Sequence, residues 1–171
     1  GAMVAEAMRQ CAAKGVRGVV LFSGGFAELG DEGRHAQEEI SRIARDSGMR
    51  LVGPNCIGAF SVTQQCYLTF MSGVTGQVPP SSKRIGLASQ SGGYGAHILK
   101  LAEQRGLAVT DMVTTGNEAD VEIGEVIHWM AECAQWQNTA PIIHDACAPT
   151  EEPFNLMVPR SRCPHCGHQI R

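Results

Sequence analysis

Apolar residues follow a helical period in the first part of the chain, and short apolar runs separate the helical stretches. Residues 4–14 carry apolar side chains on one face of a helix, and Gly15 then provides a C-terminal stop. That face consists of Val4, Met8, Cys11 and Ala12. The next run, GVVLFS, ends at Ser23 and predicts a strand buried on both faces, since continuous apolar runs are typical of covered parallel sheets.

The same alternation continues to residue 53 and begins again at Arg84. A second helix is predicted where small or apolar residues recur at helical spacing, namely at Ala36, Ile40, Ile43, Ala44 and Ser47. Gly48 ends this helix, and MRLVG predicts a strand. From Arg84 the pattern gives a strand RIGLAS, a helix over 93–105, a strand AVTDMVTT and a last helix, for which Asp120 is the expected N-cap.

Helices that alternate with strands over short connections predict an α/β fold built on parallel sheets. We expect a first unit over residues 1–71, a turn-rich linker over 72–83 and a second unit over 84–132. Within the first unit, GPNCIGAFSV is expected to be a loop and QCYLTFM a strand. Residues 133–171 hold five of the eight prolines and show no sustained period, so an irregular tail is expected there.

Composition narrows the class of partner. The 171 residues are 43% hydrophobic and 18% charged with a net charge of −3, so neither nucleic-acid binding nor a basic membrane-binding face is expected. No apolar stretch approaches the ~18 residues of a membrane span and no signal-peptide pattern opens the chain, which predicts a cytoplasmic protein. Seven cysteines, an odd number, favour thiols over a disulfide framework.

A glycine-rich turn, SQSGGYG from Ser89 to Gly95, joins a predicted strand to a predicted helix. Backbone N–H groups in the first turn of a helix lack intrahelical partners, and the helix dipole adds positive charge, so the turn suits a phosphate. The glycines equally suit close packing of the helix on the sheet, and both interpretations stay open on these residues alone. The Lys-Ser/Thr of a P-loop is absent, which disfavours a Walker-type nucleotide site.

Two further loops, SGGF after Phe22 and GPNC after Val52, also follow predicted strands. Open α/β sheets bind ligands at the carboxyl ends of their strands, so both loops are candidate binding elements. Asn55 suits either a hydrogen bond to a ligand or closure of the turn. Cys56 suits either a place near a ligand or the role of a small buried residue.

Four ordered blocks, CAAKGVRGVVLFSGGFAE, GMRLVGPNCIGAFSV, IGLASQSGGYG and VTTGNEADV, resemble parts of the NDP-forming acyl-CoA synthetases. That family includes ADP-forming acetate–CoA ligases and is similar to the succinyl-CoA synthetase alpha subunit. The resemblance covers about residues 4–132 and implies a Rossmann-like, CoA-binding unit followed by a flavodoxin-like unit, both incomplete. It also implies conversion of acyl-CoA, ADP and phosphate to acid, CoA and ATP through an acyl phosphate and a phosphohistidine.

The resemblance gives roles to residues at three strand ends. It implies CoA binding by Ser23, Gly24, Gly25, Phe26, Asn55 and Cys56. It implies phosphate binding by Ser89, Gln90, Ser91, Gly92 and Gly93. The partners that it implies are CoA, phosphate and an ATP-grasp beta subunit.

Two parts of the family pattern are expected outside this chain. The strand and glycine loop that grip the CoA phosphates would precede residue 1, and the phosphorylated His with its orienting Glu would lie beyond the GNEAD block. His35, His97 and His128 do not occupy that position. No catalytic residue is therefore assigned, and the chain by itself is expected to be an inactive fragment.

The tail contains CPHCGH, in which Cys163 and Cys166 have the spacing of zinc ligands. The other ligands would have to come from a second chain or from His144, Cys147, His165 or His168. The segment PFNLMVPRSRCPHCGHQIR also resembles the cytoplasmic segment of prepilin peptidases, but without that family's membrane spans or aspartate motifs, so peptidase activity is not implied. The change of character near residue 133 indicates a fusion, a misassembled reading frame or a chimera.

Three hypotheses about function stay open. The first is a fragment of an acid–CoA ligase that binds CoA and phosphate. The second is a zinc-knuckle binding or structural module, or a prepilin-peptidase-derived chimera, without enzyme activity. The third is a truncated product that self-associates through an exposed sheet edge.

Overall fold

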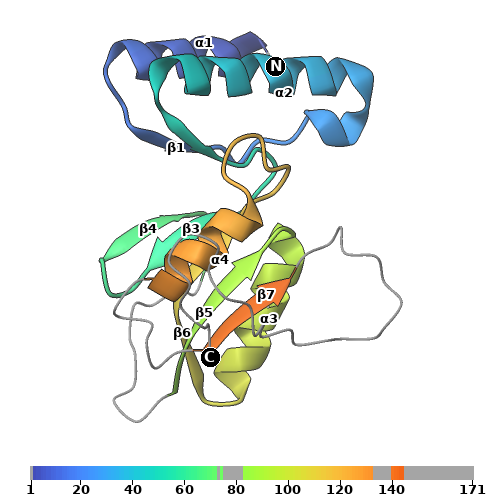
Figure 1. Cartoon of the computed structure of the whole chain (residues 1–171). Coiled ribbons are helices and arrows are strands. Elements are labelled where there is room, and N and C mark those ends of the chain that lie inside the picture. Colours follow the sequence, from blue (N-terminus) through green and yellow to red (C-terminus); the bar gives the residue numbers. More distant parts are fainter. Residues whose placement is uncertain (1, 73, 75–82, 133–139, 145–171) are drawn as a thin grey trace.

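The computed structural model describes residues 2–72, 74, 83–132 and 140–144, which form two α/β units (Figure 1). The first unit consists of α1 (Ala2–Ala13), β1 (Gly18–Val20), the 3-10 helix η1 (Ala27–Leu29), α2 (Asp31–Ser47) and β2 (Arg50–Val52). The second consists of β3 (Gly58–Ser61), β4 (Cys66–Thr69), β5 (Lys83–Ser89), α3 (Gly92–Gln104), β6 (Leu107–Thr114), α4 (Ile123–Glu132) and β7 (Ala140–His144). The predicted α/β class is confirmed.

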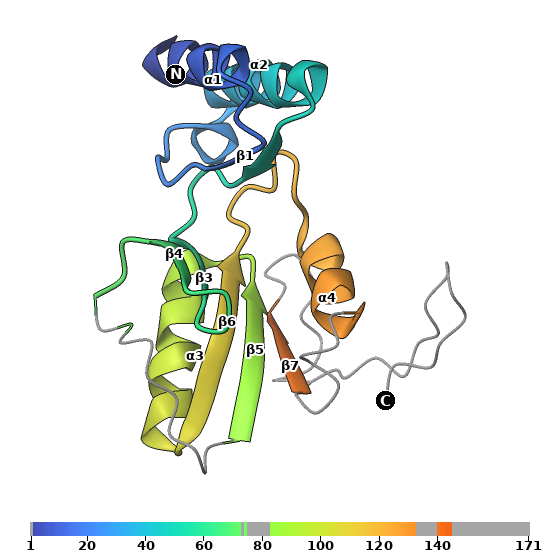
Figure 2. The ribbon, with the colours of Figure 1, turned by 90° about the vertical axis from the view of Figure 1, so that its left-hand side faces the viewer.

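In the first unit, α1 and α2 lie side by side over the two-stranded parallel sheet β1–β2 (Figures 1 and 2). The predicted helical faces are the ones that pack. Met8 of α1 and Ile40 and Ala44 of α2 are buried together with Leu51 of β2. Gly48 ends α2 in the left-handed region, with a φ of 69°, as the sequence pattern predicted.

The strand predicted to end at Ser23 is shorter and less buried than expected. β1 ends at Val20, and its residues are exposed or half-buried. The expectation of burial on both faces is wrong because, in the described part of the chain, β1 pairs with β2 alone and the helices cover one side. The amide of Leu21 still donates to the carbonyl of Val52, and the chain then leaves the sheet.

The second unit is a sheet in the order β4-β3-β6-β5-β7 with a helix on each face (Figure 2). β5 pairs in parallel with β6 and β7, whereas β3 runs antiparallel to both β4 and β6. Leu87 belongs to the core under α3, and the next residue, Ala88, belongs to the core under α4. Successive strand residues point to opposite faces, so the two helices cover opposite sides of the sheet.

Two strands lie where the sequence predicted none. β3 forms inside the segment predicted as a loop, because β4 and β6 supply its hydrogen bonds. β7 forms inside the expected irregular tail and extends the sheet beside β5, so the α/β pattern continues past residue 132. Pairing also places β3 and β4 in the sheet of the second unit, on the far side of the boundary expected after residue 71. The division into domains stays a prediction.

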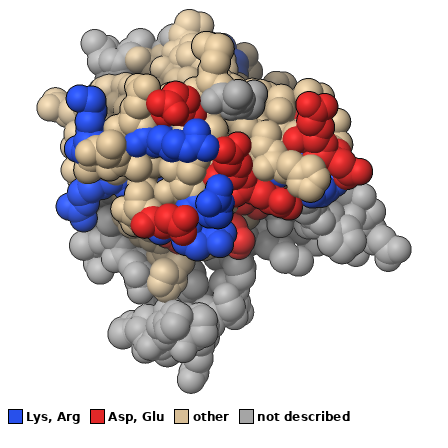
Figure 3. All heavy atoms as spheres, turned by 90° about the horizontal axis from the view of Figure 1, so that it is seen from above, with Lys and Arg blue, Asp and Glu red and all other residues tan. Residues whose placement is uncertain are grey.

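Charged side chains of both signs are interspersed over the helices of the first unit, as Figure 3 shows. Arg9 pairs with Glu6 and Glu39, and Arg34 pairs with Asp31. On this face the described residues therefore present no extended basic surface of the kind that neutralises phosphates of nucleic acid. None of the helices in the described ranges has the length and apolar character needed to cross a bilayer.

Asp111 of β6 is a buried carboxylate. It is 2% exposed, and neither carboxylate oxygen has a hydrogen-bond partner within the part of the chain that is described. Its strand neighbours are Gly86 and Ser61. Burial raises the pKa of the Asp111 carboxyl, and the nearby hydroxyls of Ser61 and Thr110 offset this only in part. The neutral form of Asp111 is therefore more favoured in the folded chain than in the unfolded chain.

We expect Asp111→Asn to raise the free energy of unfolding at neutral pH. The native pKa lies above the unfolded value of about 3.9. The stability of the wild-type chain therefore falls as the pH rises from the unfolded pKa through the native pKa, and it stays lower at higher pH. An amide cannot ionise, so a gain of about 1 kcal/mol or more is expected at about pH 7.5 and should shrink toward about pH 4. Thermal denaturation at both pH values measures it, and an equal gain at both would contradict the explanation.

Candidate functional site

The loop over residues 115–121, between β6 and α4, joins the two units and is hereafter the bridging loop. Five of its amides donate to carbonyls at the ends of β5 and β2. The pairs are Thr115 to Ser89, Gly116 to Gln90, Asn117 to Pro54, Ala119 to Gly53 and Val121 to Leu51, at 2.9–3.0 Å. These bonds fix the carboxyl ends of β2, β5 and β6 relative to one another.

Gly116 allows the bridging loop to approach the loop after β2. Its φ is 62°, and a Cβ atom at this position would lie 2.1 Å from the carbonyl oxygen of Pro54. Any other L-residue would therefore displace that carbonyl as well as strain its own backbone. The glycine of the GNEAD block is thus required by a contact between the units.

Asn117 connects side chains from both units. Its amide nitrogen donates to Glu28 and, at 3.0 Å, to Gln37, both in the first unit. Its amide oxygen accepts from the side-chain nitrogen of Asn55 at 3.2 Å. Asn55 is thereby held beside the bridging loop, which supports its interpretation as a turn-closing residue. It also lines the pocket described below.

The carboxylate of Glu28 occupies the glycine loop after β1. It accepts from the amides of Gly25, at 2.5 Å, and Phe26, at 3.2 Å. Burial raises the pKa of Glu28, but the hydrogen bonds from Asn117 and from these amides outweigh it, so the net pKa is lowered and the group is ionised at neutral pH. In this conformation the two amides are engaged within the chain.

Arg50 makes a charged connection between the units. Its guanidinium donates to Asp120 at 3.0 Å and to both carboxylate oxygens of Glu125 at 2.7 Å. Asp120 also accepts from the amide of Leu51 at 2.7 Å, so its expected role as the N-cap of α4 is wrong. The carboxylate of Glu118 accepts from the first amide of α4, that of Ile123, at 2.8 Å.

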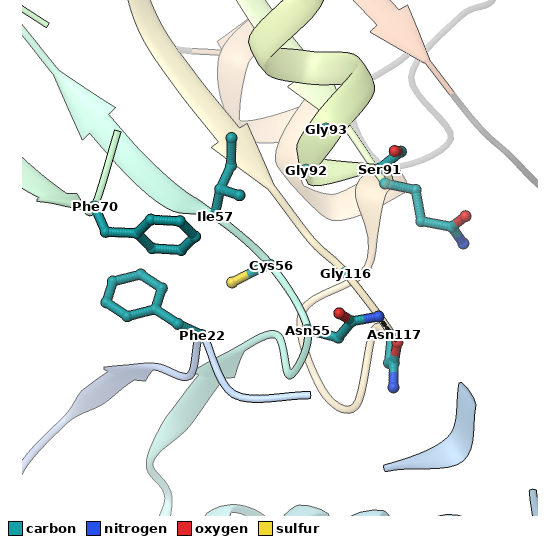
Figure 4. A pocket seen from close by; sticks show the side chains of 11 residues that line it. Phe22, Asn55, Cys56, Ile57, Phe70, Ser91, Gly92, Gly93, Gly116 and Asn117 are labelled. Atoms are coloured by element: carbon teal, nitrogen blue, oxygen red, sulfur yellow. Dashed lines mark hydrogen bonds between the residues drawn. The ribbon is translucent and has the colours of Figure 1, made fainter. Parts of the chain in front are cut away.

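A pocket of about 430 Å³ opens beside the bridging loop (Figure 4). Residues that follow β1, β2, β4, β5 and β6 line it: Phe22, Asn55, Cys56, Ile57, Phe70, Gln90, Ser91, Gly92, Gly93, Gly116 and Asn117. The carboxyl ends of strands are where open α/β sheets bind ligands, so this is the candidate site.

The first turn of α3 forms the polar wall of the pocket. Ser91 is the N-cap, and its hydroxyl accepts from the amide of Tyr94 at 3.3 Å. A Cβ at Gly92 would lie 2.8 Å from a methyl of Ile57, whereas no atom would lie within 4 Å of a Cβ at Gly93. The helix start therefore borders open space, and its first amides have no intrahelical acceptor, which suits an anion.

Ser89 and Cys56 form hydrogen bonds within the chain. Ser89 is fully buried, and its hydroxyl donates to the carbonyl of Ser91 at 2.8 Å. Cys56 is 3% exposed, and its thiol donates to the carbonyl of Leu21 at 3.5 Å. Burial raises the pKa of the Cys56 thiol, so it is uncharged at neutral pH. The structure favours the interpretation of Cys56 as a small buried residue.

The structure brings some of the predicted site residues together and separates others. Those that line the pocket are Asn55, Cys56, Gln90, Ser91, Gly92 and Gly93. The loop over residues 23–26 does not line it: a Cβ at Gly24 would face Asn55, and the side chain of Phe26 is buried in the first core. The CoA-binding roles predicted for this loop stay predictions.

Sequence reasoning missed part of the site. Gly116 and Asn117 belong to the GNEAD block, and its place after a predicted strand was a usable signal. Phe22 and Phe70 carried no such signal, because each lay inside a predicted strand, GVVLFS or QCYLTFM.

The metal prediction lies outside the described residues. Cys163 and Cys166, and the segment that resembles prepilin peptidases, are not described. Among the residues that are described, no group of three or more His, Cys, Asp or Glu side chains is placed to hold a metal ion.

Both units match known domain families. The CoA binding domain family matches residues 2–61, and the succinyl-CoA ligase like flavodoxin domain family matches residues 82–145. The chain thus carries one domain of each of these two families, and the relatives that it matches are acyl-CoA synthetases and ligases. The second match includes β7, in agreement with its place in the sheet.

Relatives among characterised acyl-CoA synthetases are much longer. A trans-feruloyl-CoA synthase from an unknown prokaryotic organism is 38% identical over 130 residues, which is 75% of this chain and 18% of that protein. The alpha subunit of ADP-forming acetate–CoA ligase II of Pyrococcus furiosus is 30% identical over 129 residues, 75% of this chain and 27% of that one. The chain thus spans less than a third of their length.

Two solved structures share the fold. A Pyrococcus horikoshii OT3 protein superposes with a TM-score of 0.71 at 32% identity, over 83% of this chain and 31% of that chain. The dinucleotide forming acetyl-coenzyme A synthetase 1 of Ca. Korarchaeum cryptofilum was solved with phosphate and ADP. It superposes with a TM-score of 0.70 at 26% identity, over 82% of this chain and 28% of that chain.

Thr114, at the end of β6, holds the pocket segment before β3 against the sheet. Its buried hydroxyl accepts from the amides of Ile57, at 3.1 Å, and Gly58, at 3.0 Å. The same hydroxyl donates to the carbonyl of Gly58 at 2.9 Å. One side chain thus satisfies three backbone groups next to the site.

We expect Thr114→Val to lower the free energy of unfolding by about 2 kcal/mol or more, because an isosteric side chain leaves two amides without an acceptor. Thr114→Ser keeps the hydroxyl and is the matched control, with an expected loss of about 1 kcal/mol for the missing methyl. Urea denaturation measures both. If the serine variant is as unstable as the valine variant, the hydroxyl does not have this role.

Proposed function

We propose that this chain is the CoA- and phosphoryl-binding part of an NDP-forming acid–CoA ligase. The complete reaction converts acyl-CoA, phosphate and ADP into acid, CoA and ATP. One observation carries the proposal: the pocket lies at strand ends of both units and has the N-terminus of α3 as its polar wall. The match of residues 2–61 to the CoA binding domain family supports CoA as the ligand.

The proposed chemistry places negative charge at the start of α3. A phosphate oxygen attacks the thioester carbonyl, the C–S bond breaks, and CoA leaves as the thiol, which gives an acyl phosphate. The phosphoryl group then passes to a histidine with release of the acid, and from the histidine to ADP. In these steps the first amides of α3, at Gly92 and Gly93, are proposed to stabilise the phosphoryl oxygens without a cationic side chain.

No catalytic residue is proposed within this chain. The phosphorylated histidine and its orienting glutamate are expected beyond the bridging loop, and the matched residues make up only 18% and 27% of the two relatives. We therefore propose that turnover needs further protein. An ATP-grasp beta subunit is the proposed partner, since one relative is named as a subunit alpha.

Five other predictions stand beside this one. Zinc at Cys163 and Cys166 rests on their spacing alone. Self-association through a sheet edge, a cytoplasmic location and the division into residues 1–71, a linker 72–83 and residues 84–132 rest on sequence patterns. The resemblance of residues 23–26 to the family's CoA loop supports CoA contacts there, with Ser23 and Gly24 as the donors not engaged by Glu28.

We expect CoA to bind the purified chain and to raise its melting temperature. A ligand that binds the native state alone stabilises it by about 2.7 kcal/mol at 100 times its Kd. Isothermal titration with CoA gives the affinity, and AMP serves as the control for nonspecific nucleotide binding. The absence of both heat and a thermal shift with CoA would refute the CoA assignment.

Gly93→Asp should weaken phosphate binding and leave the fold intact. No atom would lie within 4 Å of the added Cβ, and an acidic residue in the first turn of a helix is favourable, but its charge repels an anion at the same place. Gly93→Asn has the same size without the charge and is the matched control. Titration with inorganic phosphate, followed by 31P NMR, should show at least about tenfold weaker binding in the aspartate variant than in the asparagine variant. Equal affinities would place the anion elsewhere.

A further inference from the structure

Two exposed phenylalanines form the apolar end of the pocket. Phe22 follows β1 in the first unit, and Phe70 follows β4 in the second. Their ring centroids lie 5.2 Å apart with an angle of 82° between the ring planes. The residues are 39% and 63% exposed, so neither is a core residue. Large apolar side chains left open within a concave site indicate a ligand surface.

The chain holds both rings in place. A Cβ at Gly58 would lie 2.8 Å from the ring of Phe22, so this ring lies against the glycine that begins β3. Next to Phe70, the hydroxyl of Thr69 donates to the carbonyl of Ile57 at 2.7 Å and accepts an amide two residues further on, which fixes the end of β4. The ring of Phe22 thus has a fixed support, and the ring of Phe70 contacts it from the fixed end of β4.

Figure 4 shows that the pocket changes polarity from one side to the other. The two rings lie on one side, and the start of α3 with Asn55 and Asn117 lies on the other. Cys56 and Ile57 lie between them, and the thiol of Cys56 is uncharged. A ligand that matches this order has an anionic end and a rigid apolar end.

Size and ring geometry favour an aromatic group as the apolar end. The pocket of about 430 Å³ falls within the ~300–1,000 Å³ typical of sites for drug-sized ligands, more than a two-carbon acyl group fills. Two rings at a near right angle form a corner in which a third ring can pack against a face and an edge together. An aliphatic chain could bury apolar surface against the two rings, but it could not make these ring–ring contacts.

We propose that the pocket accepts an aromatic acyl group, with its ring in the corner of Phe22 and Phe70 and its carboxyl or acyl-phosphate end at the start of α3. This deepens the proposed function and rests on it for the identity of the anionic end. The aromatic end rests on the two rings alone.

The test uses trans-cinnamate and acetate as probes with the full chain, because neither needs CoA in order to bind. Saturation-transfer NMR should show transfer from the protein to the ring protons of trans-cinnamate. Titration should show at least about tenfold tighter binding of trans-cinnamate than of acetate. Phe22→Ala and Phe70→Ala should each weaken trans-cinnamate about five- to tenfold and leave acetate unchanged.

Tyr67→Ala is the matched control, since Tyr67 is an aromatic residue of the same strand, β4, that is 43% exposed and does not line the pocket. It should leave both affinities unchanged. Phe22→Leu and Phe70→Leu keep apolar bulk and remove the ring, and the same loss of trans-cinnamate affinity is expected from them. If an alanine variant does not fold, the leucine variants test whether the ring is needed for trans-cinnamate binding.

Each outcome separates this inference from the proposed function. Equal affinity for the two probes, or a loss in Tyr67→Ala as large as that in Phe70→Ala, would overturn the aromatic assignment. CoA binding without a preference for trans-cinnamate would overturn the aromatic assignment alone. A preference for trans-cinnamate without CoA binding would overturn the CoA assignment and support the aromatic one.

Discussion

The hydrogen bonds of the bridging loop are the constraint on which the rest of the structure depends. The described first unit is a two-stranded sheet with two helices, and so small a sheet does not hold its strand ends in place by itself. Three amides of residues 115–121 bind carbonyls at the end of β2, and two bind carbonyls at the end of β5. Arg50 adds a bidentate ion pair to α4. The pocket is a consequence, because its wall comes from segments that this loop brings together.

The same constraint explains which residues stand around the site. Gly116 is small because the carbonyl of Pro54 occupies the space of a Cβ. Asn117 is an amide because it must donate to Glu28 and accept from Asn55 at once. Thr114 carries a hydroxyl because three backbone groups of the neighbouring segment need one. These three residues thus hold the loops that surround the pocket.

What the sequence predicted well depended on local signals. α1 and α2 follow from apolar residues at helical spacing, such as Met8 and Ile40, and from the stop at Gly48. β7 was missed because its pairing is not local, since Ala140 pairs with Ile85. β3 also depends in part on a distant strand: Ala59 pairs with Val113 of β6, while its other neighbour is β4. Asp120 failed as a cap for the same reason, since Arg50, distant in sequence, binds its carboxylate. The polar half of the site was predictable from strand ends, whereas the aromatic half arises when β1 and β4 end at one place.

Glu28 shows why two similar glycine loops differ. Both follow a parallel strand, and both present amides suited to an anion. In the first loop, Glu28 stands three residues after Gly25 and returns its own carboxylate to the amides of Gly25 and Phe26. In the second, the residue three positions after Gly92 is Gly95, where the helix packs closely on Met112 and Thr114. The first loop thus fills its anion site from within and uses the charge to hold Asn117. The second loop has no carboxylate at that position, and the start of α3 lies beside the pocket. An anion at this helix start would therefore be a bound ligand and not a side chain of the same loop.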